Sequence, residues 1–288
     1  MIYIFLSVCC SVAVSIMLKL AKRYNIDVFQ AITWNYSIAI LLTWIFLKPQ
    51  LGTLAAAPVY SYAVLGFLLP ALFVVIAASV RNIGIVRTDT AQRLSLIIPL
   101  LAAFFLFNEL LTTYKLVGIA VGVIAVVLLL IKPVDGRHNA RKTASLIYPI
   151  VVFIGFGVID VMFRQLALIK EVSFTTSLFA IYVIAFVLSL IGLVYRVVTK
   201  KSKFLWRYIG FGWMLGVANF GNILFYILAH KAMAKSPSVV FSAMNIGVIA
   251  IGTLAGTFLF KEKTSWLNRA GILLAIAAVI IIAYAQTH

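Results

Sequence analysis

The sequence is poor in charged residues, and acidic residues are the scarcest of them. Among 288 residues there are 24 lysines and arginines but only 7 aspartates and glutamates, so charged residues make up 11% of the chain. A typical soluble domain carries about 25%. The longest polar stretch covers only residues 132–145, which is too short to fold alone. The composition therefore excludes a water-soluble enzyme or binding domain.

Residue groupings that bind metals or nucleotides, or that form disulfides, are also lacking. The only cysteines, Cys9 and Cys10, are adjacent within an apolar run, where they are expected to be small packing residues. No Walker loop, dinucleotide fingerprint or metal-spaced histidine cluster occurs. The histidines fall in expected loops or at helix ends: His138, His230 and His288. The sequence excludes an ATP-driven pump within this chain, predicts neither metal nor cofactor, and does not favour an enzyme.

Hydrophobic residues, by contrast, make up 64% of the chain. Apolar runs of about 20 residues recur from end to end, and a helix of that length crosses a ~30 Å hydrocarbon core. The first run lacks the basic start and the cleavage site of a signal peptide, so it is expected to be a span. We predict an all-α integral membrane protein of one domain, residues 1–288. Its ten transmembrane helices are expected at residues 2–19, 28–47, 58–80, 87–107, 114–131, 146–168, 173–195, 207–230, 237–260 and 266–285.

The net charge of +17 is spread over the short connections between these helices. Such a pattern suits membrane topology and anionic lipid headgroups, and does not indicate nucleic acid binding. Most lysines and arginines flank the loops after odd-numbered helices, as in Lys22-Arg23 and Lys200-Lys201. This excess predicts that these loops are cytoplasmic and that both termini lie outside. The expected location is a bacterial inner (plasma) membrane.

The two halves of the sequence resemble one another. Segments of the first half recur 145 residues later near the start of the second half and 153 residues later near its end, which indicates small insertions. An odd number of helices per half places the two copies in opposite orientations, as in many secondary transporters. We therefore predict two inverted five-helix repeats, residues 1–135 and 145–288. The matched segments are Ile2-Tyr3 with Ile147-Tyr148, Met17-Leu18-Lys19 with Met162-Phe163-Arg164, and residues 105–109 with 258–262.

A Phe-Leu-Phe-x-Glu turn closes the fourth predicted helix of each repeat, and a glycine follows in the next helix. The pairs are Glu109 with Gly118 and Glu262 with Gly271. Together with ten helices in two repeats, this turn resembles the drug/metabolite transporter superfamily, in particular its EamA-like members. The resemblance covers essentially the whole chain. It implies a transporter that exports or exchanges amino acids, drugs, sugars or other small metabolites, without naming the cargo.

Two charged residues lie inside predicted membrane helices, Arg93 in the fourth and Asp160 in the sixth. A charge at such depth costs at least about 2.5 kcal/mol, so it usually faces a cavity or an opposite charge. The planar guanidinium of Arg93 suits a carboxylate or a phosphate, and Asp160 suits an ammonium group or a proton. The alternatives are a structural pair between the two residues, or an Arg93 side chain that extends to the membrane interface.

Amide and phenol side chains extend the expected cavity lining. Gln92 and Asn245 occupy matched positions in the two repeats. Asn219, Asn222 and Tyr226 follow the i, i+3, i+7 spacing that places them on one helix face. All five side chains are candidates for substrate contacts. The alternative is hydrogen bonding between helices, which is worth about 0.6 kcal/mol in membranes.

Four further residues are expected to shape the helices. Glu109 and Glu262 precede the predicted helices 114–131 and 266–285, and a carboxylate is favoured at a helix N-terminus. We expect both glutamates to support the helices that follow them. Pro70 and Pro99 fall inside the third and fourth helices, where the missing backbone donor should produce kinks.

These features predict a secondary transporter for a small polar metabolite, amino-acid-like or drug-like, that works by alternating access and favours export or exchange. Its expected partners are that substrate, membrane lipid, and a proton or counter-substrate that supplies the energy. The oligomeric state stays open. An intramembrane enzyme acting on lipid substrates would need paired acids or histidines, which the sequence lacks. A passive channel is the third possibility, and internal repeats favour alternating access over a pore.

Overall fold

The computed structural model describes residues 2–95, 97–99, 101–102, 113–130, 140–167, 169, 171–232, 237–262 and 265–285. Within these residues the regular secondary structure is helical, and no β-strand occurs. The elements in chain order are α1 (Ile2–Arg23), α2 (Val28–Leu47), the 3₁₀ helix η1 (Leu51–Ala56), α3 (Val59–Ile83), α4 (Ile85–Leu94), α6 (Thr113–Leu130), α7 (Ala140–Ala167), α8 (Phe174–Val198), α9 (Trp206–Ala232), α10 (Pro237–Leu254), the π-helical segment η2 (Ala255–Leu259) and α11 (Trp266–Ala285).

The helices have the length and composition of membrane-spanning segments. Five of those described are long and apolar enough to cross a membrane: Ile2–Arg23, Val28–Leu47, Val59–Ile83, Phe174–Val198 and Trp206–Ala229. Four shorter helical stretches are also apolar: Leu116–Ala125, Ile147–Phe163, Ala243–Leu259 and Trp266–Ile282. Large apolar side chains also cover the outside of the bundle, for example Phe67 in α3 and Ile191 in α8. The structure therefore confirms the prediction of an all-α membrane protein.

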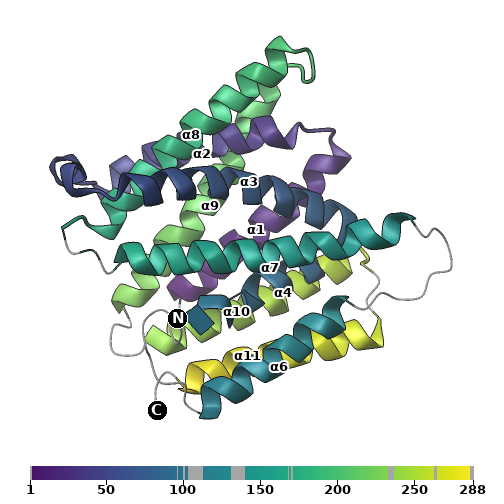
Figure 1. Ribbon diagram of the computed structural model, residues 1–288. Coiled ribbons are helices and arrows are strands. Elements are labelled where there is room, and N and C mark those ends of the chain that lie inside the picture. Colours follow the sequence, from purple (N-terminus) through teal and green to yellow (C-terminus); the bar gives the residue numbers. More distant parts are fainter. Residues whose placement is uncertain are drawn as a thin grey trace.

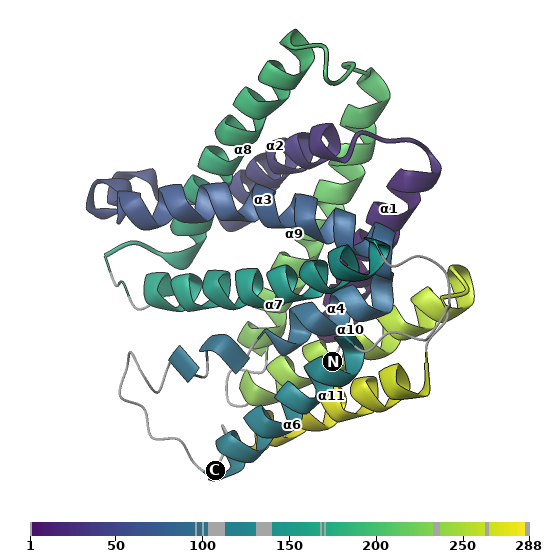
Figure 2. The ribbon, with the colours of Figure 1, turned by 45° about the vertical axis from the view of Figure 1, so that its right-hand side comes forward.

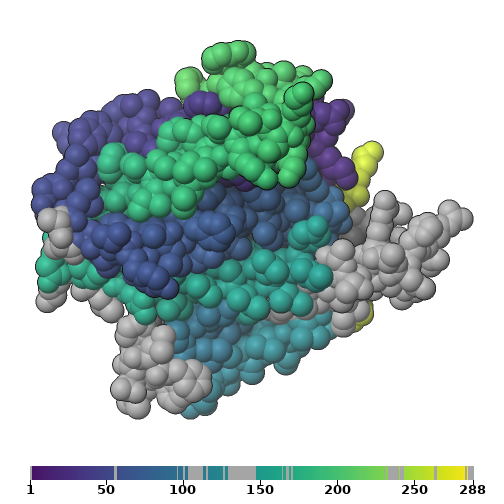
Figure 3. Space-filling model, turned by 45° about the horizontal axis from the view of Figure 1, so that its top comes forward, coloured from purple at the N-terminus to yellow at the C-terminus, as the bar shows by residue number. Residues whose placement is uncertain are grey.

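The helices pack in a layered arrangement in which segments from the two halves of the chain alternate. Figure 1 and Figure 2 show α2 beside α8 at one edge and α6 beside α11 at the other, while α9 packs against α2 and α1 and crosses the layers. Between these edges, α3 packs against both α8 and α7, an order that is visible on the face shown in Figure 3. The helix α4 packs against α7 and α10. Neither half of the chain therefore forms a separate bundle.

Local capping interactions explain where α2 and α8 begin. The Asp27 carboxylate accepts hydrogen bonds from the backbone N–H groups of Phe29 (2.9 Å) and Gln30 (3.3 Å) at the start of α2. The Ser173 hydroxyl accepts one from the N–H of Thr176 (3.3 Å) at the start of α8. Each cap satisfies backbone donors that have no partner within the helix and stabilises it by about 1 kcal/mol.

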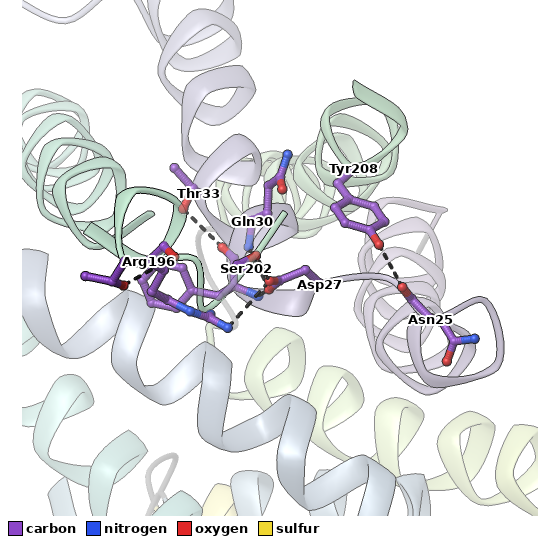
Figure 4. Close-up of polar contacts among 9 residues, drawn as sticks. Asn25, Asp27, Gln30, Thr33, Arg196, Ser202 and Tyr208 are labelled. Carbon is purple, nitrogen blue, oxygen red and sulfur yellow. Dashed lines mark hydrogen bonds and ion pairs between the residues drawn. The ribbon is translucent and has the colours of Figure 1, made fainter. Parts of the chain in front are cut away.

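Asp27 also binds residues at the end of α8 and in the loop that follows it. Its carboxylate lies 3.5 Å from the guanidinium of Arg196 and accepts a hydrogen bond from the Ser202 hydroxyl, as Figure 4 shows. Nearby, the Tyr208 hydroxyl donates to the backbone carbonyl of Asn25 (2.9 Å), and the Gln30 amide donates to the carbonyl of Leu205 (3.0 Å). These bonds hold the start of α2 against the connection between α8 and α9.

The fourth predicted helix, residues 87–107, differs most from the structure. The helix α4 begins at Ile85 and ends at Leu94, and residues 97–99 and 101–102 are again helical. Pro99 explains the interruption, because it has no N–H to donate to the carbonyl of Ser95. That carbonyl instead accepts from the N–H of Ile98 at 2.9 Å. The Ser95 hydroxyl donates to the carbonyl of Gln92 at 2.6 Å, which competes with regular helix bonding.

Candidate functional site

Arg93 lies near the middle of the bundle, eight residues after the start of α4, or roughly 12 Å along the helix. Its guanidinium donates a hydrogen bond from Nη2 to the Ser11 hydroxyl of α1 at 2.7 Å. Its Nε is buried and has no hydrogen-bond partner among the described residues. The charges of Asp89 and Asp160 and the hydroxyl of Tyr226 act on this guanidinium. Arg93 therefore sits in the bundle with part of its hydrogen-bonding capacity unused.

Asp160 is accessible although it lies deep among the helices. The apolar residues Ile147, Val151, Ile154 and Val158 are exposed along one side of α7, as expected for a lipid-facing stripe. Asp160 follows Val158 by two residues, which places it roughly 200° around the helix axis. It is thus exposed on the side of α7 that faces Arg93 and away from the lipid-facing stripe.

Asp89 is a third charged residue of this cluster, and the sequence analysis missed it. It lies one turn before Arg93 on α4 and is only 3% exposed. The Ser15 hydroxyl of α1 donates to its Oδ1 at 2.7 Å. The helix was expected to start at residue 87, only two residues before Asp89. The i, i+4 spacing of an aspartate and an arginine was the signal that could have identified it.

Tyr226 completes the cluster from α9. The charges of both Arg93 and Asp160 act on its hydroxyl group. The structure therefore brings together three of the predicted site residues, Arg93, Asp160 and Tyr226. They come from α4, α7 and α9, and Asp89 joins them from α4.

The two asparagines of α9 hold neighbouring helices. The Ser7 hydroxyl of α1 donates to the backbone carbonyl of Asn222 (2.7 Å) and to its Oδ1 (2.8 Å). The amide of Asn219 donates to Oδ1 of Asn35 in α2 at 3.5 Å. These contacts favour hydrogen bonding between helices for both asparagines. Of the other two predicted amides, Asn245 is buried in α10 and Gln92 is half-buried in α4.

Glu262 closes one end of the site and supports a different helix from the one expected. Its carboxylate accepts hydrogen bonds from the N–H groups of Ile85 (2.8 Å) and Val86 (3.3 Å), so it caps α4 and not α11. It also lies 3.3 Å from the ammonium of Lys19 in α1. The prediction that Glu262 supports the helix after it was wrong, because chain neighbours need not be spatial neighbours. Glu109 lies outside the described residues.

The side chains present suit a polar ligand that carries opposite charges. Arg93 can bind a carboxylate or phosphate oxygen, and the accessible Asp160 can bind an ammonium group. Within the part of the chain that the structure describes, no three histidine, cysteine or acidic side chains lie close enough together to hold a metal ion. The arrangement can bind and neutralise charged groups between the helices.

Comparison with known proteins gives a relative of similar length. No protein-family model matches the sequence. An uncharacterized protein of Haemophilus influenzae is 40% identical over 285 residues, which cover 96% of this chain and 96% of the relative. At that identity and coverage the two chains share one fold. This chain therefore belongs to the same family as the Haemophilus influenzae protein.

Proposed function

We propose that this protein is a secondary transporter of the drug/metabolite transporter superfamily that carries a small polar metabolite across a bacterial inner membrane. Two inverted five-helix repeats, residues 1–135 and 145–288, would rock about a central site. Arg93 and Asp160 would bind opposite charges of the substrate, as in an amino acid. Lysines and arginines after odd-numbered helices favour cytoplasmic loops there and external termini.

The pattern of helix packing supports the repeat. We exchange each helix of the first half with its counterpart in the second: α1 with α7, α2 with α8, α3 with α9, α4 with α10, and α6 with α11. Under this exchange the pair α1–α9 becomes α7–α3, and α2–α9 becomes α8–α3. The pair α1–α10 becomes α7–α4. All six of these helix pairs are in contact. The pairs α2–α8, α4–α10 and α6–α11 map onto themselves and are also in contact. A twofold relation between the halves would produce this pattern.

Two glycines at which neighbouring helices approach closely show the same exchange of helices between the halves for single residues. A Cβ atom on Gly66 of α3 would overlap the side chain of Ile184 in α8. A Cβ atom on Gly216 of α9 would overlap the side chain of Ile38 in α2. Shifts of 150 and 146 residues, which lie between the shifts of 145 and 153 of the matched segments, pair Gly66 with Gly216 and Ile38 with Ile184. Such paired contacts, with the helices of the two halves exchanged, support the proposed repeat.

The observation that carries the proposal is the position of the charges relative to the halves. Arg93 belongs to the first half and Asp160 to the second, and each acts on the other electrostatically. A substrate held between them would therefore contact both halves at once. Rocking the halves would change the surroundings of the bound substrate, which is what alternating access requires.

Substrate exchange in proteoliposomes tests this function. The vesicles are loaded with a mixed panel of amino acids and nucleotides, and exchange of labelled compounds is measured for wild type and Arg93→Ala. We expect exchange of at least one zwitterionic or anionic compound by wild type, reduced at least about tenfold in the variant, because a charged hydrogen bond worth about 1.5–3 kcal/mol is lost.

Arg87→Ala is the matched control for this experiment. Arg87 lies on the same helix, but its guanidinium donates to Oδ1 of Asn268 in α11 at 2.6 Å. We expect this variant to retain exchange. Equal exchange by wild type and Arg93→Ala would remove Arg93 from the site. No exchange of any compound by wild type would contradict the proposed substrate class.

A further inference from the structure

The second carboxylate of the site, Asp89, is buried, whereas Asp160 is exposed. Asp89 is 3% exposed, and its Oδ1 accepts the hydrogen bond from Ser15. Its other oxygen, Oδ2, is buried and receives no hydrogen bond from any described residue. The backbone of α10 approaches this oxygen closely, since a Cβ atom on Gly252 would lie 2.8 Å from it. Among the described residues, this buried carboxylate oxygen therefore has no donor and lies in the contact between α4 and α10.

We propose that Asp89 is a proton-binding site that couples transport to a proton gradient. The inference rests on the proposed transport function and adds the coupling ion to it. A proton fits the free oxygen, because it needs a single acceptor atom. Metal cations such as Ca²⁺ or Mg²⁺ take about six oxygen ligands. Among the described residues, the hydroxyl that bonds to Asp89 is that of Ser15.

The charged groups around Asp89 link its proton to the substrate. Arg93 lies one turn away on the same helix, and Glu262 approaches from the loop after η2, paired with Lys19 of α1. From α7, Asp160 acts on Arg93. Arg87 points instead to Asn268 of α11.

Protonation would therefore remove one of the two carboxylate charges that act on Arg93. The guanidinium then becomes the stronger binder of a substrate anion. Proton binding and anion binding favour one another, and this coupling is reciprocal.

The described contacts of Asp89 from α1 and α10 are with uncharged residues, and Lys19 of α1, one turn after Ser15, is paired with Glu262. The α1 neighbour is the hydroxyl of Ser15, and the α10 neighbour is Gly252. In α3, the Ser79 hydroxyl bonds instead to Thr88 of α4 at 2.7 Å. Arg93 is therefore the cation whose electrostatic surroundings change most when Asp89 gains or loses a proton.

The repeat gives Asp89 a counterpart in the other half. A shift of 145 residues matches Ser15 with Asp160, and a shift of 153 matches Asp89 with Ser242. Each half thus contributes one serine and one aspartate at equivalent positions, with their helices exchanged. In the present conformation the aspartate of the second half is exposed and that of the first half is sealed. A rocking motion would expose Asp89 from the opposite side, where its proton could exchange.

Infrared spectroscopy tests proton binding directly and needs no substrate. The protein in lipid bilayers is titrated with acid while the carbonyl absorption of protonated carboxyl groups is recorded for wild type, Asp89→Asn and Asp160→Asn. We expect one titrating band that is lost in Asp89→Asn and retained in Asp160→Asn. Identical bands in wild type and Asp89→Asn would overturn the assignment.

A milder variant keeps the test valid if Asp89→Asn does not fold. Ser15→Ala removes the hydroxyl that donates to Oδ1. The ionised carboxylate loses a donor, so the midpoint of the same band should move to higher pH. An unchanged midpoint would contradict the proposal.

A transport measurement then separates the coupling from the transport function itself. Proteoliposomes containing the exchanged compounds of the panel receive an inward proton gradient. We expect wild type to accumulate the labelled compound and Asp89→Asn to lose this accumulation while it still exchanges compound for compound. Equal accumulation by both would overturn coupling through Asp89. An absence of all exchange would contradict only the transport function, because the infrared titration still decides whether Asp89 binds a proton.

Discussion

The ammonium of Lys19 lies 3.3 Å from the carboxylate of Glu262, and this ion pair joins α1 of the first half to the loop after η2 of the second. Lys19 also donates to the carbonyl of Val80 at the end of α3, at 3.0 Å. The pair closes the end of the bundle at which α4 begins. Under the proposed repeat, Lys19 is matched with Arg164 and Glu262 with Glu109, which would supply the same charges at the opposite end.

We expect Glu262→Gln to destabilise the protein by roughly 1–2 kcal/mol, because charge-assisted hydrogen bonds to α4 and the ion pair with Lys19 are weakened together. Thermal unfolding in detergent should show a Tm lower by several degrees. Lys261→Gln is the matched control, since Lys261 is exposed one residue earlier. Lys19→Gln should cost less than Glu262→Gln, because it leaves the cap of α4 in place. Equal Tm values for Glu262→Gln and Lys261→Gln would show that the ion pair and cap contribute nothing measurable.

The approach of α9 to α2 depends on a glycine. A Cβ atom at Gly216 would lie 2.6 Å from the backbone oxygen of Asn35, so Gly216→Ala must push the helices apart. Overpacking of this kind costs typically about 1–3 kcal/mol. We expect a lower Tm and a lower yield of folded protein for Gly216→Ala.

Gly210→Ala provides the control on the same helix. A Cβ atom at Gly210 would have no neighbour within 4 Å, so alanine there should be neutral or slightly stabilising through its higher helix propensity. A Tm for Gly216→Ala that equals or exceeds that of Gly210→Ala would contradict the close approach.

The apolar pattern of the sequence was sufficient to predict most of the described helices and two of the charged residues within them. Apolar runs separated by short polar segments predicted the ends of several described helices to within a few residues, as in α2 and α11. Arg93 and Asp160 stood out because a charge inside an apolar run is costly. The electrostatic link between them followed from the structure, since residues so far apart in the chain carry no local signal of contact.

Other features of the site depended on contacts between distant segments. The interruption of α4 at Ser95 arises because Pro99, four residues later, has no backbone N–H to donate. The presence of this proline predicted a kink in the helix but not the position of the kink. Asp89 was overlooked. The predicted helix began only two residues before it, at residue 87, whereas α4 begins at Ile85. Glu262 caps α4, which precedes it by more than 170 residues, and no short-range pattern in a sequence encodes such a partner.

Cysteine labelling tests the different surroundings of the two aspartates. In a background with Cys9 and Cys10 replaced by serine, Asp160→Cys and Asp89→Cys each remove one carboxylate of the site. Asp160 is exposed and Asp89 is sealed. We expect a charged, water-soluble maleimide to modify Asp160→Cys roughly tenfold faster, because the reaction requires an accessible thiolate.

A third variant separates water from lipid as the cause of exposure. Val158 is 40% exposed on the lipid-facing stripe of α7, two residues before Asp160. A cysteine there should meet hydrocarbon and react slowly with the charged reagent, although Val158 and Asp160 are both exposed. Fast labelling of Asp160→Cys beside slow labelling of Val158→Cys would place Asp160 in a water-filled opening. Slow labelling of both would mean that Asp160 faces lipid, and the proposed site would then lose its acidic side chain.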